Sequence, residues 1–354
     1  MVLRNGGDDT FKTKISDVLN QELYKDRSLI TQDYKMAQAF INGEYWGVYI
    51  LQERIDKETI SDKVNLNPED IVLIKKQNVI DDDQILYDDF LNLLSFIENN
   101  DMSVSLNYEY VKNKMDVQSY IDLRCFEIYT NRSDGTNNNY NNVAEWKIIK
   151  EGKDIDSKYN FILYDTENDT DYEYADIIWN PVFTSLLKNE EFKKQFIISY
   201  MDVINHNFEY KKVHELIEEL KNKIELSVVE SHKRFIRENY SLDDYHNELN
   251  KLDGFYKNEK ERALNSLIKD LGIKEPMYKI SIINNKNVDY TINTINTNSN
   301  FEGEYFSTYP IKASSENDNV IGWKVNDELI KEKSIEITLN KDTNIEIILK
   351  WQRH

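Results

Sequence analysis

The feature that most constrains this chain is a polar loop that directly follows an apolar helix. Residues 120–129 carry apolar side chains at helical spacing, and this pattern predicts a mostly buried helix. The following segment, residues 131–139, is rich in Asn and contains Gly135. Both residue types tolerate the tight and left-handed backbone conformations that such a loop needs. The chain is therefore expected to pass from a rigid buried element straight into a polar segment.

Two apolar stretches after this loop predict a β-hairpin that ends at an acid. Residues 146–150 and 159–164 have the pattern of strands, joined around residues 151–154. Asp165 follows the second strand directly. Because a strand end holds its side chains rigidly, we expect the polar loop and Asp165 to belong to one site.

Three polar residues in this region match the parts of a phosphoryl-transfer site. Asp134 and Asn139 stand five positions apart in the loop, and Asp165 follows the strand. Phosphoryl transfer uses one carboxylate to accept a hydroxyl proton, and an amide oxygen and a second carboxylate to hold the metal that neutralises the phosphates. Protein kinases place their base and their metal-binding Asn at the same five-residue offset. Such pairs also arise by chance, and an Asp after a strand is often a turn former, so an ordinary loop stays open as the alternative.

Several further motifs, in order along the chain, resemble the spore coat protein H (CotH) kinase family. The family's helix ends in an N-x-D-x-x-x-N-N loop, which resembles Asp134, Asn138 and Asn139 here, with Asn131 one position further from Asp134 than in that pattern. A tryptophan strand follows at Trp146, and the family's Y-D-x-D strand end resembles residues 164–167. The beginning of the chain is similar as well, with L-R-N-G-G-D-D at residues 3–9, F-I-N-G-E-Y-W-G-V-Y at residues 40–49 and E-R-I-D at residues 53–56.

The resemblance implies an α+β fold, namely a divergent protein-kinase-like fold with a largely helical C-lobe. It implies an atypical protein kinase that uses Mg²⁺ or Mn²⁺ and transfers the γ-phosphate of ATP to Ser or Thr hydroxyls of a spore-coat or cell-surface protein. Carried over residue by residue, it makes Asp134 the catalytic base. It assigns the metal to Asn139, Asp165 and Glu167, and the nucleotide to Asn138 and Arg54.

The chain departs from the family pattern at two points. Family members usually read D-x-D-x-x-F-G at the strand end, whereas residues 165–170 read D-T-E-N-D-T, without the aromatic-glycine pair. Glu167 can still bind a hard cation, but its longer side chain shifts the geometry. Family members also carry a β-rich stretch before L-R-N-G-G, whose basic residue is expected to reach the nucleotide phosphates. Its absence here predicts either a fragment or a shortened member.

The charge balance narrows the choice of partners. The chain has 354 residues and a formal net charge of −20, which argues against nucleic acid and against an anionic membrane surface. An acidic protein must approach ATP through a metal or through local cations, for which the candidates are Lys75, Lys76, Arg54 and Lys147. The N-terminus has no signal-peptide pattern and no apolar run reaches membrane length, so no membrane insertion is expected.

A change of composition at Lys274-Glu275-Pro276 predicts a domain boundary. We expect a kinase-like domain over residues 1–275, in which residues 1–80 are the remnant of a mixed α/β N-terminal lobe and residues 81–275 form the helical lobe with the site. A small, antiparallel, sandwich-like β-domain is expected over residues 276–354. Its predicted strands are 278–283, 288–295, 309–313, 320–325, 334–339 and 344–349.

The aromatic segment 301–306 resembles a motif of β-modules appended to some secreted family members. Its rings would suit contact with carbohydrate, although aromatic residues in a small sandwich more often belong to the core.

The remaining patterns predict the elements around the site. An amphipathic helix is expected within residues 12–30, with Ile15, Val18, Leu19 and Leu23 on one stripe. The Asn42-Gly43 pair predicts a type I′ hairpin between residues 37–41 and 45–52. A strand at 71–75 and helices at 86–98, 210–238 and 242–271 follow, the last with Ser241 as its N-cap.

Two other functional classes stay open on the sequence. The first is a non-catalytic CotH-like protein that keeps the fold and serves in coat or cell-surface assembly. The second is a glycoside hydrolase that uses Asp134 and Asp165 as its two carboxylates, which is disfavoured because Asn139 would then have no part.

Overall fold

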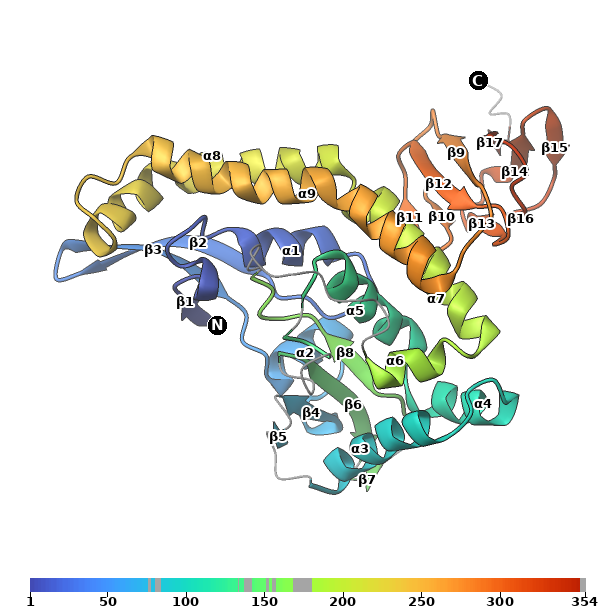
Figure 1. Ribbon diagram of the computed structural model, residues 1–354, viewed down its shortest axis with the longest axis horizontal. Coiled ribbons are helices and arrows are strands. Elements are labelled where there is room, and N and C mark those ends of the chain that lie inside the picture. Colours follow the sequence, from blue (N-terminus) through green and yellow to red (C-terminus); the bar gives the residue numbers. More distant parts are fainter. Residues whose placement is uncertain are drawn as a thin grey trace.

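A computed structural model describes residues 1–75, 78–79, 84–132, 134–136, 142–150, 153–154, 157–167 and 180–350. The predicted α+β class is confirmed: a body of helices and two small sheets precedes a β-rich region with sheets of its own (Figure 1). Two long helices, α8 (Tyr210–Phe235) and α9 (Leu242–Leu271), run along one side of the body (Figure 1).

The N-terminal sheet consists of β1 (Val2–Arg4), β3 (Glu44–Gln52) and β2 (Tyr34–Ile41), in that order and antiparallel. The predicted hairpin is confirmed. Asn42 and Gly43 join β2 to β3 with φ values of 53° and 82°, the positive pair that a type I′ turn requires. Arg4 lies opposite Ile50 in the register, two residues from the end of β3.

The first helix, α1 (Ser16–Tyr24), is shorter than the segment in which the sequence predicts it. Its apolar stripe is buried as predicted, at Ile15, Val18, Leu19 and Leu23. A second stripe at the same helical spacing is also buried, at Asp17, Asn20, Gln21 and Tyr24. Because both stripes are buried, the polar side chains of α1 need partners inside the protein.

The second sheet has the strand order β5-β4-β6-β7, with β8 also paired to β6. The predicted hairpin between residues 146–150 and 159–164 is present, since Ala144 pairs with Ile162. A short strand intervenes, however, because the chain first turns back as β7 beside the end of β6. The bounds are β4 (Ile71–Lys75), β5 (Asn78–Val79), β6 (Ala144–Lys150), β7 (Lys153–Asp154) and β8 (Asn160–Ile162).

The predicted buried helix is α5 (Val117–Tyr129), which is enclosed from Ser119 to its end. The other helices of the body are α2 (Lys57–Val64), α3 (Gln84–Asn99), α4 (Ser105–Lys114), α6 (Pro181–Leu186) and α7 (Glu190–Asp202), which continues as a π-helical turn (Val203–Asn207). Ser241 caps α9 as predicted, in a capping box with Asp244. Among the described residues, no helix has both the length and the apolar character needed to cross a bilayer.

The C-terminal strands form two sheets, in the orders β11-β10-β13-β16 and β12-β9-β17-β14-β15. The expected strand 288–295 divides in two, because Asn293 adopts a φ of 48° between β10 and β11. The bounds are β9 (Met277–Ile283), β10 (Tyr290–Ile292), β11 (Ile295–Thr297), β12 (Phe301–Phe306), β13 (Ile311–Ser314), β14 (Val320–Val325), β15 (Glu328–Ile330), β16 (Ser334–Ile337) and β17 (Thr343–Leu349).

Two expectations for this region need correction. The strands are not all antiparallel, since β9 and β17, the first and last of the region, pair in parallel. Such a pair needs a long connection, which here is the rest of the region. The rings of Phe301, Tyr305 and Phe306 are buried, so they offer no exposed surface for stacking on sugars.

A buried carboxylate joins the β-rich region to the helical body. Asp202, at the end of α7, accepts hydrogen bonds from Asn293 Nδ2 (3.0 Å), Tyr305 Oη (2.7 Å) and the Thr294 backbone N–H (3.0 Å). Arg27 Nη1 also donates to the Thr294 hydroxyl, at 2.8 Å. Within the described residues, the strands of 277–349 pair in sheets only with one another. The domain boundary at residue 275 stays a prediction. If it is one, the hydrogen bonds of Asp202 connect the two domains.

Asp202→Ala should loosen the β-rich region from the body. Several buried donors would lose their acceptor, at about 1–3 kcal/mol each, so we expect a fall in stability on the order of 3 kcal/mol. Limited proteolysis should then cut near residues 272–276 faster than in the wild type. Glu304→Ala is the control, because the Lys260–Glu304 ion pair lies half exposed at the rim of this contact. Equal cleavage rates in the two variants would contradict the role of Asp202.

One buried acid lies in the middle of the second sheet. Glu145 pairs with Ile74 and Phe161 of the neighbouring strands and is 2% exposed. Within the described residues, its Oε1 has no hydrogen-bond partner. Burial raises the pKa of Glu145 from 4.5 to about 8. The folded state thus keeps a proton that the unfolded state loses, and stability should fall as the pH rises from about 4.5 to 8.

Glu145→Gln should stabilise the protein at high pH and change little at low pH. Gln resembles the protonated carboxyl but cannot ionise. At pH 9 the variant should therefore gain more than about 1.4 kcal/mol, the value of one pKa unit. Urea unfolding between pH 5 and 9 measures this. Glu98→Gln, at an exposed position of α3, should follow the wild-type pH dependence. A gain from Glu145→Gln that is the same at pH 5 and pH 9 would refute the explanation.

Candidate functional site

The segment that carries Asp165 is held by the polar stripe of α1. Asn20 Nδ2 donates to the Thr166 carbonyl at 2.7 Å, and Gln21 Nε2 donates to the Leu163 carbonyl at 3.2 Å. The Asp17 carboxylate accepts the Thr166 backbone N–H at 2.9 Å and the Thr166 hydroxyl at 2.6 Å. These bonds fix the backbone on both sides of Asp165, which adopts a left-handed φ of 57°.

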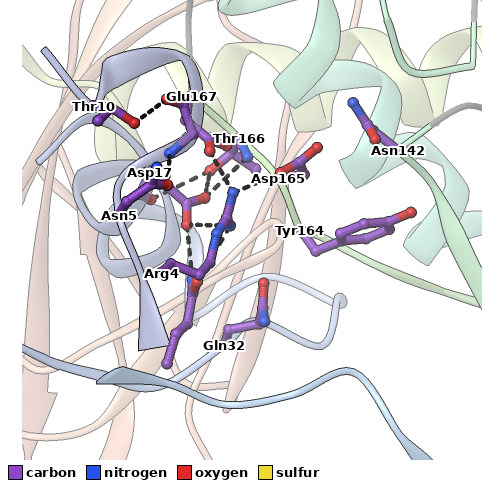
Figure 2. Close-up of polar contacts among 12 residues, drawn as sticks. Arg4, Asn5, Thr10, Asp17, Gln32, Asn142, Tyr164, Asp165, Thr166 and Glu167 are labelled. Carbon is purple, nitrogen blue, oxygen red and sulfur yellow. Dashed lines mark hydrogen bonds and ion pairs between the residues drawn. The ribbon is translucent and has the colours of Figure 1, made fainter. Parts of the chain in front are cut away.

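Arg4 lies at the centre of a cluster of carboxylates (Figure 2). Its Nη2 donates to Asp165 Oδ1 at 2.7 Å and also to Glu167 Oε1. Its Nη1 donates to Asp17 Oδ2 at 3.1 Å and to Gln52 Oε1 at 3.3 Å. One guanidinium group therefore joins β1, α1, β3 and the segment after β8.

Gly7 leaves the space that Glu167 occupies. A Cβ built on Gly7 would lie 1.7 Å from Glu167 Oε1, and its φ of 56° also favours glycine. The glycines of the L-R-N-G-G segment thus let the N-terminal turn (Gly7–Asp9) pack directly against an acid of the site.

The cluster shifts the pKa values of its members. Burial raises the pKa of Glu167 to about 8, with further contributions from Asp17 and Asp165, while Arg4 acts in the opposite direction. Burial by itself would lower the pKa of Arg4, but the neighbouring carboxylates outweigh it and raise the value. The cluster thus holds three carboxyl groups around one guanidinium group.

Asp134 lies beside this cluster and is held from both sides. Arg132 Nε donates to its Oδ1 at 2.9 Å, and Asn142 Nδ2 donates to its Oδ2 at 2.6 Å. The side chain is about half exposed. The buried Arg132 also donates from Nη2 to the carbonyl oxygen of Asp165 at 2.7 Å and to that of Tyr164 at 3.2 Å. One guanidinium group thus binds both the carboxylate of Asp134 and the main-chain carbonyl of Asp165.

The loop that carries Asp134 is anchored on the last turns of α5. Glu127 Oε1 accepts the Thr136 backbone N–H at 2.8 Å, and Glu127 Oε2 accepts from Arg124 Nη1 at 2.6 Å. A Cβ on Gly135 would lie 1.9 Å from Glu127 Oε1. Gly135 is therefore required here for close approach, rather than for the left-handed conformation that the sequence suggests.

The other predicted residues differ in where they lie. Asn138 and Asn139 lie outside the described residues. Arg54 is 67% exposed and lies 3.9 Å from Asp56, and it is absent from the contacts that the structure gives for the Arg4 cluster. The structure thus leaves these three assignments as predictions.

Of the expected local cations, Lys75 is the one seen beside the site. Its Nζ lies 4.7 Å from the ring centroid of Tyr164, the residue before Asp165. Lys147 is buried, 3.9 Å from Asp89 and 4.8 Å from the ring of Tyr159. Lys76 lies outside the described residues.

The carboxylates suit a hard cation as part of a ligand set. Asp165 Oδ1 and Glu167 Oε1 both contact the same nitrogen, Arg4 Nη2, so oxygens from two side chains converge on one positively charged point. Carboxylate oxygens are the ligands that Mg²⁺ prefers. Among the described residues, no group of three or more His, Cys, Asp or Glu side chains forms a metal site. A further oxygen ligand would have to come from elsewhere, such as the predicted Asn139.

Sequence reasoning missed four residues of this site: Arg4, Asp17, Arg132 and Asn142. One signal was available, because Asp17 belongs to a polar stripe that repeats at positions i, i+3, i+4 and i+7 beside the apolar stripe of the same helix. Such a stripe ordinarily indicates a solvent-facing side. Its burial depends on the segment after β8, which lies about 150 residues away in the sequence.

Comparison with known proteins assigns the chain to a protein family. No curated protein matches the chain. The family model described as CotH kinase protein matches residues 1–263, which include Arg4, Asp134 and Asp165. Because this match covers most of the 354 residues, the chain belongs to the CotH kinase family, and its α+β body is a kinase-like fold.

Proposed function

We propose that this chain is a metal-dependent atypical kinase that transfers the γ-phosphate of ATP to Ser or Thr hydroxyls of a spore-coat or cell-surface protein. The observation that carries the proposal is that Arg132 binds both the carboxylate of Asp134 and the main-chain carbonyl of Asp165, which keeps the two acidic residues close together. Membership of the CotH kinase family supports this proposal, since a kinase binds a nucleotide and a phosphate acceptor.

Asp134 is the proposed base. Its carboxylate is held by Arg132 and Asn142, and its exposed half leaves room for the hydroxyl of an acceptor. It would take the proton as the hydroxyl oxygen forms a bond to the γ-phosphorus. The bond between this phosphorus and the β,γ-bridging oxygen breaks, and ADP leaves. A base already held by two donors needs little rearrangement to act.

Asp165 and Glu167 are the proposed metal ligands, with Asn139 as a third. The divalent cation would supply positive charge that neutralises the phosphates. The chain's own part is to hold two carboxylates at one point, through the bonds from α1 to the backbone of Leu163 and Thr166. Lys75, Arg54 and Asn138 are the proposed contacts of the nucleotide, and Lys75 is the one that lies beside Tyr164.

Asp165→Asn and Asp134→Asn should separate nucleotide binding from turnover. Asp165→Asn removes a ligand charge and should abolish metal-dependent ATP binding, and Asn tolerates the left-handed backbone at this position. Asp134→Asn should leave ATP binding within a few-fold of the wild type and lower turnover by ~10²–10⁴-fold, the usual contribution of a general base. Calorimetric titration with MgATP and transfer of labelled phosphate to a Ser/Thr-rich acceptor measure the two effects.

Asp253→Asn is the matched control, because Asp253 pairs with Tyr210 and His214 on the long helices, away from these contacts. It should keep both properties. Should the wild type neither bind ATP with Mg²⁺ or Mn²⁺ nor label any acceptor, the kinase proposal fails and a non-catalytic role in coat or surface assembly takes its place. Weakened ATP binding in Asp134→Asn equal to that in Asp165→Asn would refute the division of roles.

A further inference from the structure

We propose that Arg4 is a positioning residue of this site, which holds Asp165 and Glu167 together without metal and gives them up when a divalent cation binds. The inference deepens the proposed function, on which it rests. It concerns a residue of β1 that lies far from the predicted site in the sequence, and it has this residue compete with the metal for the two carboxylates.

The two terminal nitrogens of Arg4 have different partners. Nη1 contacts Asp17 and Gln52, which are 2% and 0% exposed and hydrogen-bond to each other at 2.8 Å. Nη2 contacts Asp165 and Glu167, which are the proposed metal ligands. The Nη1 side is therefore a fixed anchor inside the protein. The Nη2 side reaches solvent through the side chain of Asp165, which is 30% exposed, whereas that of Glu167 is 5% exposed, so a cation would enter beside Asp165.

The charges of the cluster make this competition direct. Two carboxyl groups converge on one point, where a positive charge stabilises their ionised forms, and Nη2 supplies that charge. A divalent cation that binds the same two oxygens must displace the hydrogen bonds from Nη2. Because Nη1 stays anchored, the freed Nη2 remains at the site as a donor for a phosphate oxygen.

A purely structural role would have different consequences. The backbone of Arg4 is held by its pairing with Ile50, which does not depend on the side chain. If Arg4 only braced the site, its removal would weaken binding of the metal with or without nucleotide. If Arg4 competes with the metal, its removal should strengthen binding of the metal alone and weaken binding of the metal–nucleotide complex.

The test is calorimetric titration of the full chain with MnCl₂ alone and then with MnATP. Arg4→Gln should bind Mn²⁺ alone about tenfold tighter than the wild type, since hydrogen bonds between charged groups no longer compete. It should bind MnATP about tenfold more weakly than the wild type does, because a phosphate donor is lost. Arg237→Gln is the matched control, because Arg237 pairs with the single acid Asp244 at the start of α9.

Arg4→Lys keeps the test decisive if Arg4→Gln does not fold, as judged by circular dichroism. The ammonium group keeps the charge but cannot reach both pairs of partners at once. This variant should therefore bind Mn²⁺ alone about threefold tighter than the wild type, between the wild type and Arg4→Gln.

Unchanged or weaker Mn²⁺ binding in the folded variants would overturn the inference. The outcome is separate from that of the kinase proposal. Tighter Mn²⁺ binding in Arg4→Gln, with no phosphate transfer by the wild type, would support the role of Arg4 and count against the kinase. Phosphate transfer with no change in Mn²⁺ affinity would support the kinase and overturn the role of Arg4.

Discussion

The site depends on a buried polar face of one short helix. Asp17, Asn20 and Gln21 of α1 bond to the backbone between Leu163 and Thr166, and these bonds hold Asp165 in its left-handed conformation. Their polar groups are shielded from water, so each lost partner would cost about 1–3 kcal/mol. Because of this cost, the segment that carries Asp165 has one favoured position on α1.

The same use of buried polar groups recurs at two other junctions of the fold. Glu127 and Arg124 at the end of α5 hold the loop of Asp134, while Asp202 at the end of α7 holds the β-rich region. A buried ion pair adds little net stability, but removing one of its partners is costly. In this strongly acidic chain, buried carboxylates therefore help to select which segments meet, while burial of the apolar core supplies the driving force for folding.

Local sequence patterns predicted the structure correctly where neighbouring residues alone decide the backbone conformation. The Asn42-Gly43 turn, the apolar helix over 120–129, the strand 71–75 and the Ser241 cap were all predicted from neighbouring residues and are all present. Errors occurred where partners lie far away in the sequence. The parallel pairing of β9 with β17 and the division of residues 288–295 at Asn293 are such cases.

The sequence by itself determined the local order of helix, loop, strand and acid around Asp134 and Asp165. This order follows from periodicity and turn chemistry, which act over a few residues, whereas the α+β class was implied by the family resemblance of the motifs. Only the tertiary structure decided that Arg4 lies among the acids, that Arg132 joins Asp134 to Asp165, and that the polar stripe of α1 is buried. Each of these joins segments from distant parts of the chain, and a charged side chain has the same local pattern whether it meets water or an opposite charge inside the protein.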